Sequence, residues 1–301
     1  MRYLGVELDS RLSFTRHIAS APAKATKSAK AIGRLMPNIG GPSQAKRALL
    51  ATVVASKLLY ASPIWATVGV KTEKNRPAMA RAQRTTAIRI IWAYRTISAE
   101  ASSVISSMIP ADLIAHERAR IRNRQQEYEP PTLANIRNEE RAITIASWQA
   151  RWDRSTKGRW THRLIPHVKR WLEKAPMSLN FHTTQMLSGH GCYRSYLWKI
   201  NRANDGSCLY CGYHEDDVEH TTFQCPRWNA ERDRMCPFLN GRLPTADDVP
   251  DLLCGPPGIE NQDARIREAS LRARSEFVGM VENIMKAKED DKRAREREGD
   301  G

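Results

Sequence analysis

Apolar residues near the start of the chain alternate in part with polar ones. The run Tyr3-Leu4-Gly5-Val6-Glu7-Leu8-Asp9 has this pattern, and a period of two is typical of a strand with one buried face. Gly5 would allow a bulge or a close approach of another backbone. We therefore predict a short strand or hairpin over residues 3–12.

After Ser13 the pattern takes the period of a helix. The first apolar set at this spacing is Ala25, Ala29, Ile32 and Met36. Pro22 is expected to break or kink the beginning of this helix. Ser43 offers an N-cap for a second helix, whose apolar face would carry Leu50, Val54, Leu58 and Ala61. Pro63 is expected to end that helix.

Residues 76–174 predict several further helices with a strongly basic surface. Pro110 stands at a position typical of a first helical turn. The helix behind it would carry arginines at every second position, which wrap about half of the cylinder: Arg118, Arg120, Arg122 and Arg124. Trp148 and Trp152 lie four residues apart, a spacing more often found in a packed core than in a base-stacking surface.

The C-terminal part predicts a linker, a helix and a tail. Residues 251–258 are rich in Pro and Gly and indicate a linker. A last helix from about Arg265 would bury, on one side, Ile266, Leu271, Val278, Val281 and Met285. Beyond Lys286 the residues are charged and weakly apolar, so we expect a frayed or disordered tail. The predicted fold class is mainly α with a short N-terminal β-hairpin.

The net charge of the chain indicates its binding partners and says nothing about its fold. The 301 residues carry a formal net charge of +15. A chain this basic favours polyanions such as RNA or DNA, although a solvated arginine-rich surface is the alternative. The membrane candidate is 48–65, but it contains Lys57 and stops at Pro63, so a buried helix and no membrane partner are expected.

Four residues form the strongest candidate for chemistry. Cys208, Cys211, His220 and Cys225 have the spacing C-x2-C-x8-H-x4-C. Three thiolates and one imidazole complete a tetrahedral zinc shell, which leaves no position for a reacting water, so we predict a structural zinc. Reduced structural thiols or disulfides are the alternatives. His214 is a possible substitute ligand, and the cysteines outside the pattern are expected to be buried thiols: Cys192, Cys236 and Cys254.

The segment around these four residues is acidic. It contains no Lys or Arg between Asp205 and Cys225, and its acidic residues are Asp205, Glu215, Asp216, Asp217 and Glu219. Because negative charge repels phosphate, we do not expect the surface of this segment to bind a nucleic-acid backbone directly. We expect it to brace the basic helices around it.

An ordered set of short motifs carries a resemblance to a known family. These motifs are Tyr3-Leu4-Gly5-Val6 with Leu8-Asp9, Leu59-Tyr60-Ala61, Tyr94-Arg95-Thr96-Ile97-Ser98, Gly158-Arg159-Trp160-Thr161, Thr184-Gln185-Met186-Leu187-Ser188-Gly189-His190-Gly191 and the Cys-Cys-His-Cys set. In this order they resemble the end of a reverse transcriptase of non-long-terminal-repeat retrotransposons. The likeness is strongest to the insect type-1 elements that insert into ribosomal RNA genes.

The resemblance implies a role for each part of the chain. Residues 1–70 would be the end of the reverse transcriptase domain, with Leu4 and Gly5 beside the primer grip and a thumb-like helical bundle behind them. Residues 71–175 would be a basic helical region, 176–260 the zinc-stapled nucleic-acid-binding region, and 261–301 the C-terminal helix and charged tail. The implied partners are RNA, DNA and the remainder of the Pol polyprotein, in an intracellular setting with access to the nucleus.

The polymerase chemistry itself is not expected in this chain. The Tyr-x-Asp-Asp motif that holds magnesium in the palm of reverse transcriptases is absent from the sequence. The parent would be an RNA-directed DNA polymerase, a nucleotidyltransferase with endonuclease, so magnesium is expected only in its missing palm. We assign no catalytic residue and no small-molecule substrate here. The residues predicted to contact phosphate are Arg118, Arg120, Arg122, Arg124, Arg159 and Lys169.

Two other functions stay open at this point. One is a zinc-dependent protein-interaction module, in which the acidic segment docks a basic partner. The other is the endonuclease region of the same polyprotein, because Pro250-Asp251 and Asp290-Asp291-Lys292 loosely fit a nuclease motif. The sequence leaves the preference between RNA and DNA, the genomic target site and the oligomeric state undecided.

Overall fold

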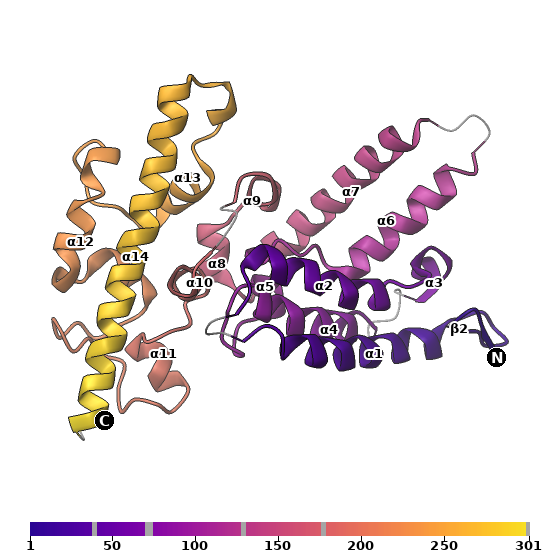
Figure 1. Cartoon of the computed structure of the whole chain (residues 1–301), viewed down its shortest axis with the longest axis horizontal. Helices are drawn as coiled ribbons and strands as arrows, with labels where there is room; N and C mark the ends of the chain where they lie inside the picture. The colour runs from indigo at the N-terminus through magenta and orange to yellow at the C-terminus, as the bar shows by residue number, and fades with distance from the viewer. Residues whose placement is uncertain (38–40, 70–74, 128–130, 176–178, 299–301) are drawn as a thin grey trace. The chain divides into compact units, whose positions relative to one another are not determined.

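The computed structural model describes residues 1–37, 41–69, 75–127, 131–175 and 179–298. These residues are mainly helical with a small N-terminal hairpin, as predicted (Figure 1). They form two compact units. Unit 1 comprises Met1–Trp92 and Ser98–Lys157, and unit 2 comprises Ala93–Ile97 and Gly158–Gly301. The four regions predicted from the sequence are assignments of role, and they stay predictions.

The hairpin of unit 1 is formed by β1 (Arg2–Tyr3) and β2 (Val6–Glu7), which pair in antiparallel register. Leu4 and Gly5 connect them with φ angles of 44° and 85°. Positive φ at both central residues is the turn geometry that matches the twist of two adjacent strands. The hydroxyl of Tyr60 donates a hydrogen bond of 2.7 Å to the Leu4 carbonyl oxygen. This contact fixes the turn in a conformation that Leu seldom adopts.

Two prolines of unit 1 act differently from the prediction. Helix α1 (Thr15–Gly33) continues through Pro22, which is buried inside it. Of the predicted break or kink, the break therefore does not occur, and the kink stays a prediction. Helix α2 (Gln44–Leu58) ends before Pro63, and Pro63 lies in the first turn of α3 (Ser62–Gly69). Since the N–H groups of a first turn have no helical partner, proline costs little there.

The remaining helices of unit 1 complete its core. They are α4 (Asn75–Ile90), α5 (Ala99–Ile105), α6 (Ala111–Arg124) and α7 (Leu133–Arg154). Helix α1 packs on α2 and α4, α3 packs on α6, and α6 and α7 form an antiparallel pair (Figure 1). Buried side chains include Ile18, Val54, Leu58, Trp65 and Met79. Trp148 and Trp152 are also buried, which confirms the prediction that they are packing residues.

The membrane candidate is divided between α2 and α3. Among the described residues, no single helix has both the length and the apolar composition needed to cross a membrane. The bent pair Gln44–Leu58 and Ser62–Val68, with an angle of 64° at the break, meets both criteria when its two parts are taken together.

Unit 2 consists of short helices packed around one long helix. The short helices are α8 (Arg159–Leu164), α9 (Val168–Lys174), α10 (Phe181–Ser188), α11 (Arg194–Lys199), a π-helical turn (His220–Gln224), α12 (Asn229–Asp233) and α13 (Val249–Cys254). The long helix is α14 (Ala264–Glu298), and α10, α12 and α13 pack against it (Figure 1).

Two predictions for this unit were wrong. Half of the predicted linker is α13, whose Leu252 and Leu253 are buried. The predicted tail beyond Lys286 is helical as far as Glu298.

The buried face of α14 also differs in part from the prediction. Ile266 and Leu271 are exposed, whereas Val281 and Met285 are buried as expected. The rest of the buried face is Phe277, Met280, Ile284 and Lys288. The buried Lys288 extends the packed face past Met285, the last buried apolar position of the helix.

Candidate metal centre and nucleic-acid interface

The four predicted zinc ligands are brought together by two short backbone elements. Cys208 and Cys211 lie on a tight turn, in which the Cys208 N–H bonds to the Tyr213 carbonyl oxygen at 2.8 Å and the Gly212 N–H to the Cys208 carbonyl oxygen at 2.9 Å. The φ of Gly212 is 73°, a value that favours glycine. In the π-helical turn, the Cys225 N–H bonds to the His220 carbonyl oxygen at 2.7 Å, which sets these two side chains side by side.

The ligand atoms have the spacing of a tetrahedral site. The four lie within 4.8 Å of one another. Cys225 Sγ is 3.8 Å from Cys208 Sγ and 3.9 Å from Cys211 Sγ, while Cys211 Sγ is 3.4 Å from His220 Nε2. Zinc bonds of usual length at a tetrahedral angle give sulfur–sulfur separations of about 3.8 Å and sulfur–nitrogen separations of about 3.5 Å. A disulfide needs about 2 Å, so the geometry fits a metal ion and not a disulfide.

Buried thiolates in this cluster require a positive charge beside them. Cys208, His220 and Cys225 are buried and Cys211 is exposed. Burial raises the pKa of the Cys225 thiol to about 12 and lowers the pKa of His220. A thiolate at this position therefore requires a cation beside it, and a divalent metal ion is the cation that a Cys-Cys-His-Cys set binds best. The group could thus hold a metal ion, and its composition is compatible with zinc.

The other candidates for ligands lie outside this group. His214 is exposed, with its ring 4.4 Å from that of Tyr213. Cys192 and Cys254 are buried as predicted, whereas Cys236 is half-buried.

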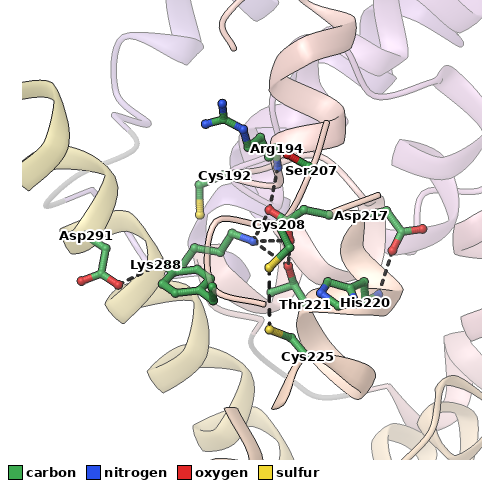
Figure 2. Close-up of polar contacts among 12 residues, drawn as sticks. Cys192, Arg194, Ser207, Cys208, Asp217, His220, Thr221, Cys225, Lys288 and Asp291 are labelled. Carbon is green, nitrogen blue, oxygen red and sulfur yellow. Dashed lines mark hydrogen bonds and ion pairs between the residues drawn. The ribbon is translucent and has the colours of Figure 1, made fainter. Parts of the chain in front are cut away.

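Helix α14 contacts residues 205–225, which we call the metal-ligand segment, from one side. Lys288 is 5% exposed, and its Nζ lies 2.6 Å from both carboxylate oxygens of Asp216 and 2.6 Å from the hydroxyl of Thr221. Figure 2 shows Lys288 and Asp291 on α14, beside the segments that carry Cys208, Thr221 and Cys225. The Tyr210 hydroxyl donates to Asp291 at 2.8 Å. Sequence reasoning missed these contacts because it treated the charged end of α14 as a tail.

The acidic residues of the segment are paired within unit 2. Asp205 pairs with Arg194 at 3.1 Å and Glu219 with Arg163 at 2.8 Å. Asp217 accepts the His220 N–H at 2.7 Å. Lys199 lies 3.8 Å from Glu215. The negative charge of the segment thus fixes it to its own unit, in keeping with the bracing role that the sequence predicts.

The arginines of α6 have mixed surroundings. Arg120 pairs with Glu140 and donates to the Thr144 hydroxyl at 3.0 Å, and Arg124 pairs with Glu139 at 2.6 Å. These two side chains bind α7. Arg118 and Arg122 are exposed, and Arg118 donates to the Leu59 carbonyl oxygen at 3.3 Å. Their contacts with phosphate stay a prediction.

The other two predicted phosphate contacts lie in unit 2. Arg159 is exposed on α8, where its guanidinium is 3.2 Å from His162 Nδ1, and Lys169 is exposed on α9. They lie on different helices, α8 and α9. In the loose nuclease motif, Asp251 pairs with Arg170 at 2.5 Å, whereas Asp290 lies 3.4 Å from Arg293 on the same helix. Asp251 therefore holds unit 2 together, and Asp290 is paired within α14.

A basic groove in unit 1 was not predicted from the sequence. It has a volume of about 770 Å³ and is lined by Gly5, His17 and Tyr60 together with the cations Arg2, Lys24, Lys27 and Lys57. We call it the hairpin groove. The predicted primer-grip neighbours lie at its edge, because Leu4 and Gly5 form the turn of the hairpin. A Cβ atom on Gly5 would lie 3.2 Å from Tyr60 Cε1, so glycine lets the turn approach that ring.

Known proteins similar to this chain belong to one class. No protein-family model matches the sequence, and no solved structure matches it. The similar curated proteins are proteins of retrotransposable elements, with Pol polyproteins among them. A 115 kDa protein of the type-1 element R1DM of Drosophila melanogaster is 27% identical over 248 residues, which is 77% of this chain and 24% of that protein.

These relatives also share one element type, the type-1 element R1. The Pol polyprotein of the type-1 element R1 2 of Nasonia vitripennis is 27% identical over 77% of this chain and 59% of its own length. That of R1 4 of the same wasp is 26% identical over 95% of this chain and 74% of its own length. Over most of its length the chain is therefore similar to R1 retrotransposon Pol polyproteins, as the motifs predicted, and it spans only part of each of these relatives.

Proposed function

We propose that this chain is the C-terminal, nucleic-acid-binding part of a retrotransposon RNA-directed DNA polymerase polyprotein. It binds RNA template or target DNA during target-primed reverse transcription, while the polymerase chemistry is performed by the remainder of the polyprotein. Target DNA lies in the nucleus, so the protein is intracellular with access to that compartment. The homology to R1 Pol polyproteins supports the polyprotein context.

The hairpin groove is the observation that carries this proposal. Four cations surround it, and among the described residues one carboxylate is paired with them, since Lys24 lies 3.3 Å from Glu7. Nucleic-acid backbones present closely spaced phosphates, which lysine and arginine bind with release of counterions. Tyr60 is 51% exposed at the groove, and its ring offers a surface on which a base or sugar can pack.

Zinc has a structural role in this proposal. Cys208, Cys211, His220 and Cys225 hold the ion in a closed shell, so it supplies folding energy and no reaction. It fixes the segment against which α14 packs. The protein-interaction alternative loses its main support, because the acidic residues that would dock a basic partner are already paired within unit 2.

Binding of a fluorescein-labelled 20-nucleotide RNA, measured by anisotropy over a salt series, tests the proposal. The wild type should show a steep linear fall of log affinity with log salt concentration. Lys27→Ala/Lys57→Ala removes two groove cations and should weaken binding about tenfold or more and lower the slope by about two.

The matched control is Lys30→Ala/Lys46→Ala. It makes the same charge change on the same two helices, but neither lysine lines the groove. Equal losses for the two double variants would mean that net charge alone attracts RNA. Absence of binding by the wild type at low salt would reject the proposed function.

A further inference from the structure

A second basic hollow lies in unit 2, between α14 and the segments on either side of the Cys208–Cys211 turn. Its volume is about 80 Å³, and five cations line it: Arg194, Arg202, Lys288, Lys292 and Arg295. The carboxylates that line it are Asp216 and Glu296. We call it the α14 pocket. None of these residues belongs to the predicted zinc shell or to the hairpin groove.

Two of the five cations are neutralised by partners inside the protein. Lys288 is buried against Asp216, and Arg194 forms two hydrogen bonds of 3.1 Å with Asp205. Because each of these cations has a carboxylate at hydrogen-bond distance, neither has charge to offer a ligand. They form the fixed wall of the pocket.

The other three cations face a smaller negative charge. Arg202 is exposed and forms no ion pair with any residue that the structure describes. Arg295 has its Cζ 5.5 Å from the ring centre of Tyr210 and donates to the Tyr210 hydroxyl at 3.4 Å, and within the described part of the chain it forms no ion pair. Lys292 pairs with Glu296, which is exposed at the rim. Among the residues that line the pocket, these three cations therefore meet one carboxylate, Glu296, which can turn into solvent. Asp291 lies outside the lining and accepts the Tyr210 hydroxyl.

We propose that the α14 pocket binds one phosphate group of a single-stranded nucleic-acid backbone, with Arg202, Lys292 and Arg295 as the donors. This inference rests on the proposed function and assigns to unit 2 a contact of its own with the nucleic-acid backbone. A phosphodiester accepts several charge-assisted hydrogen bonds at once, which suits two guanidinium groups and an ammonium around a small hollow. Glu296 competes with the phosphate for Lys292.

The size and rim of the pocket favour a phosphate within a chain. The hollow has room for a phosphate group but not for a base beside it, since sites for whole small molecules are usually several times larger. Leu209 lines the pocket and is 49% exposed, so an apolar surface is available to the sugar next to the phosphate. The acidic metal-ligand segment makes no phosphate contact in this proposal. It only holds Lys288 in the wall of the pocket, through Asp216.

The first test compares two charge-matched glutamates of α14. Glu296→Gln frees Lys292 and should tighten binding of a fluorescein-labelled 10-nucleotide RNA about threefold or more, measured by anisotropy on the full chain. Glu298→Gln makes the same change in net charge outside the pocket and should give a smaller effect. Equal effects of the two variants would overturn the assignment of Glu296 as the competitor and with it the pocket.

The second test removes the donors. Arg202→Ala/Lys292→Ala should weaken RNA binding about tenfold and lower the salt slope by about two. The control Lys286→Ala/Arg297→Ala removes two cations of α14 that lie outside the pocket and should do less. Circular dichroism and the thermal midpoint confirm that each variant is folded. Full RNA affinity in Arg202→Ala/Lys292→Ala would overturn the inference. If Lys27→Ala/Lys57→Ala is impaired in the same assay, the proposed function still stands.

A competition experiment distinguishes the two sources of a phosphate group, a nucleic-acid backbone and free inorganic phosphate. Inorganic phosphate is exchanged for chloride at fixed ionic strength while RNA binding is followed. The inference predicts that phosphate displaces RNA more readily from the wild type than from Arg202→Ala/Lys292→Ala, because free phosphate and the RNA backbone compete for the same donors. If phosphate binds the wild type more tightly than the double variant but leaves its RNA affinity unchanged, the pocket takes a free phosphate and the backbone assignment is wrong.

Discussion

Individual cations of this chain differ widely in what they do. Arg47 is fully buried in unit 1 and donates to the carbonyl oxygens of Pro42 at 2.8 Å and Arg89 at 2.9 Å. Arg232 is buried in unit 2 and donates to the Cys225 carbonyl oxygen and, at 2.6 Å, to Asn229 Oδ1. Burial lowers the pKa of both guanidinium groups. Part of the formal charge of +15 is therefore inside the protein and unavailable to RNA.

At the same scale, the metal centre gives a prediction for single cysteines. The purified wild type should contain one zinc ion per chain, and its cobalt-substituted form should show the visible spectrum of a tetrahedral thiolate site. Cys208→Ser and Cys225→Ser each remove a buried thiolate ligand, so zinc content should fall well below one. Cys236→Ser is the control, because its thiol lies outside the cluster, and it should retain the full zinc content. Retention of zinc by Cys225→Ser would show that the metal site is elsewhere.

At the scale of elements, α14 is the helix on which unit 2 depends. Its apolar face contacts α10, α12 and α13, and Lys288 pairs with Asp216 beside the metal ligands. Glu289 extends this contact, since Gln185 Nε2 donates to it at 2.8 Å and His182 Nε2 lies 3.4 Å away. A buried ion pair is costly to break from one side, because the remaining charge has no partner.

Shortening α14 tests this dependence. Deletion of residues 287–301 removes Lys288 and leaves Asp216 buried without a cation, so zinc affinity should fall about tenfold to a hundredfold, the usual cost of losing support around a metal site. The measurement is the competition between the protein and a chromogenic chelator. Deletion of 297–301 should leave zinc affinity unchanged. Lys288→Met should reproduce most of the loss and lower the free energy of unfolding of unit 2 by about 3 kcal/mol.

At the scale of the whole molecule, the two compact units do not follow the order of the chain. The segment Ala93–Ile97 belongs to unit 2, although the residues on both sides of it belong to unit 1. Within this segment the Tyr94 ring lies 6.0 Å from that of Phe181 and 6.2 Å from that of Tyr196. The Thr96 hydroxyl is 2.9 Å from His190 Nδ1 and 2.7 Å from the Tyr196 hydroxyl.

This membership predicts where the effect of one substitution appears. Tyr94→Ala removes aromatic contacts that lie in unit 2, and the expected cost is about 2 kcal/mol. Hydrogen exchange followed by mass spectrometry should show faster exchange in α10 and α11, with α1 and α6 unchanged. Faster exchange in α1 and α6 instead would assign the segment to unit 1. Arg95→Ala serves as the neighbouring control for changes in the segment itself.

The sequence alone predicted those features whose interacting residues lie close together in the chain. Local spacing accounts for the hairpin at residues 2–7, the helical class, the packing of Trp148 and Trp152, and the grouping of Cys208, Cys211, His220 and Cys225. The ligands span only residues 208–225, so a turn and one helical turn suffice to bring them together. The motifs that indicated an R1 element are likewise short stretches that need no tertiary structure to be recognised.

Only the tertiary structure decided which charged residues that are far apart in the sequence come together. Lys288 and Asp216 are 72 residues apart, and nothing in a charged C-terminal run distinguishes a buried lysine from a solvated one. The hairpin groove unites Arg2, Lys27 and Lys57 only when α1, α2 and the hairpin pack. Arg120 and Arg124 resemble free phosphate ligands in the sequence, but α7 supplies their glutamates. A charge shows its type in sequence, whereas its partner and its burial depend on which helices meet in the fold.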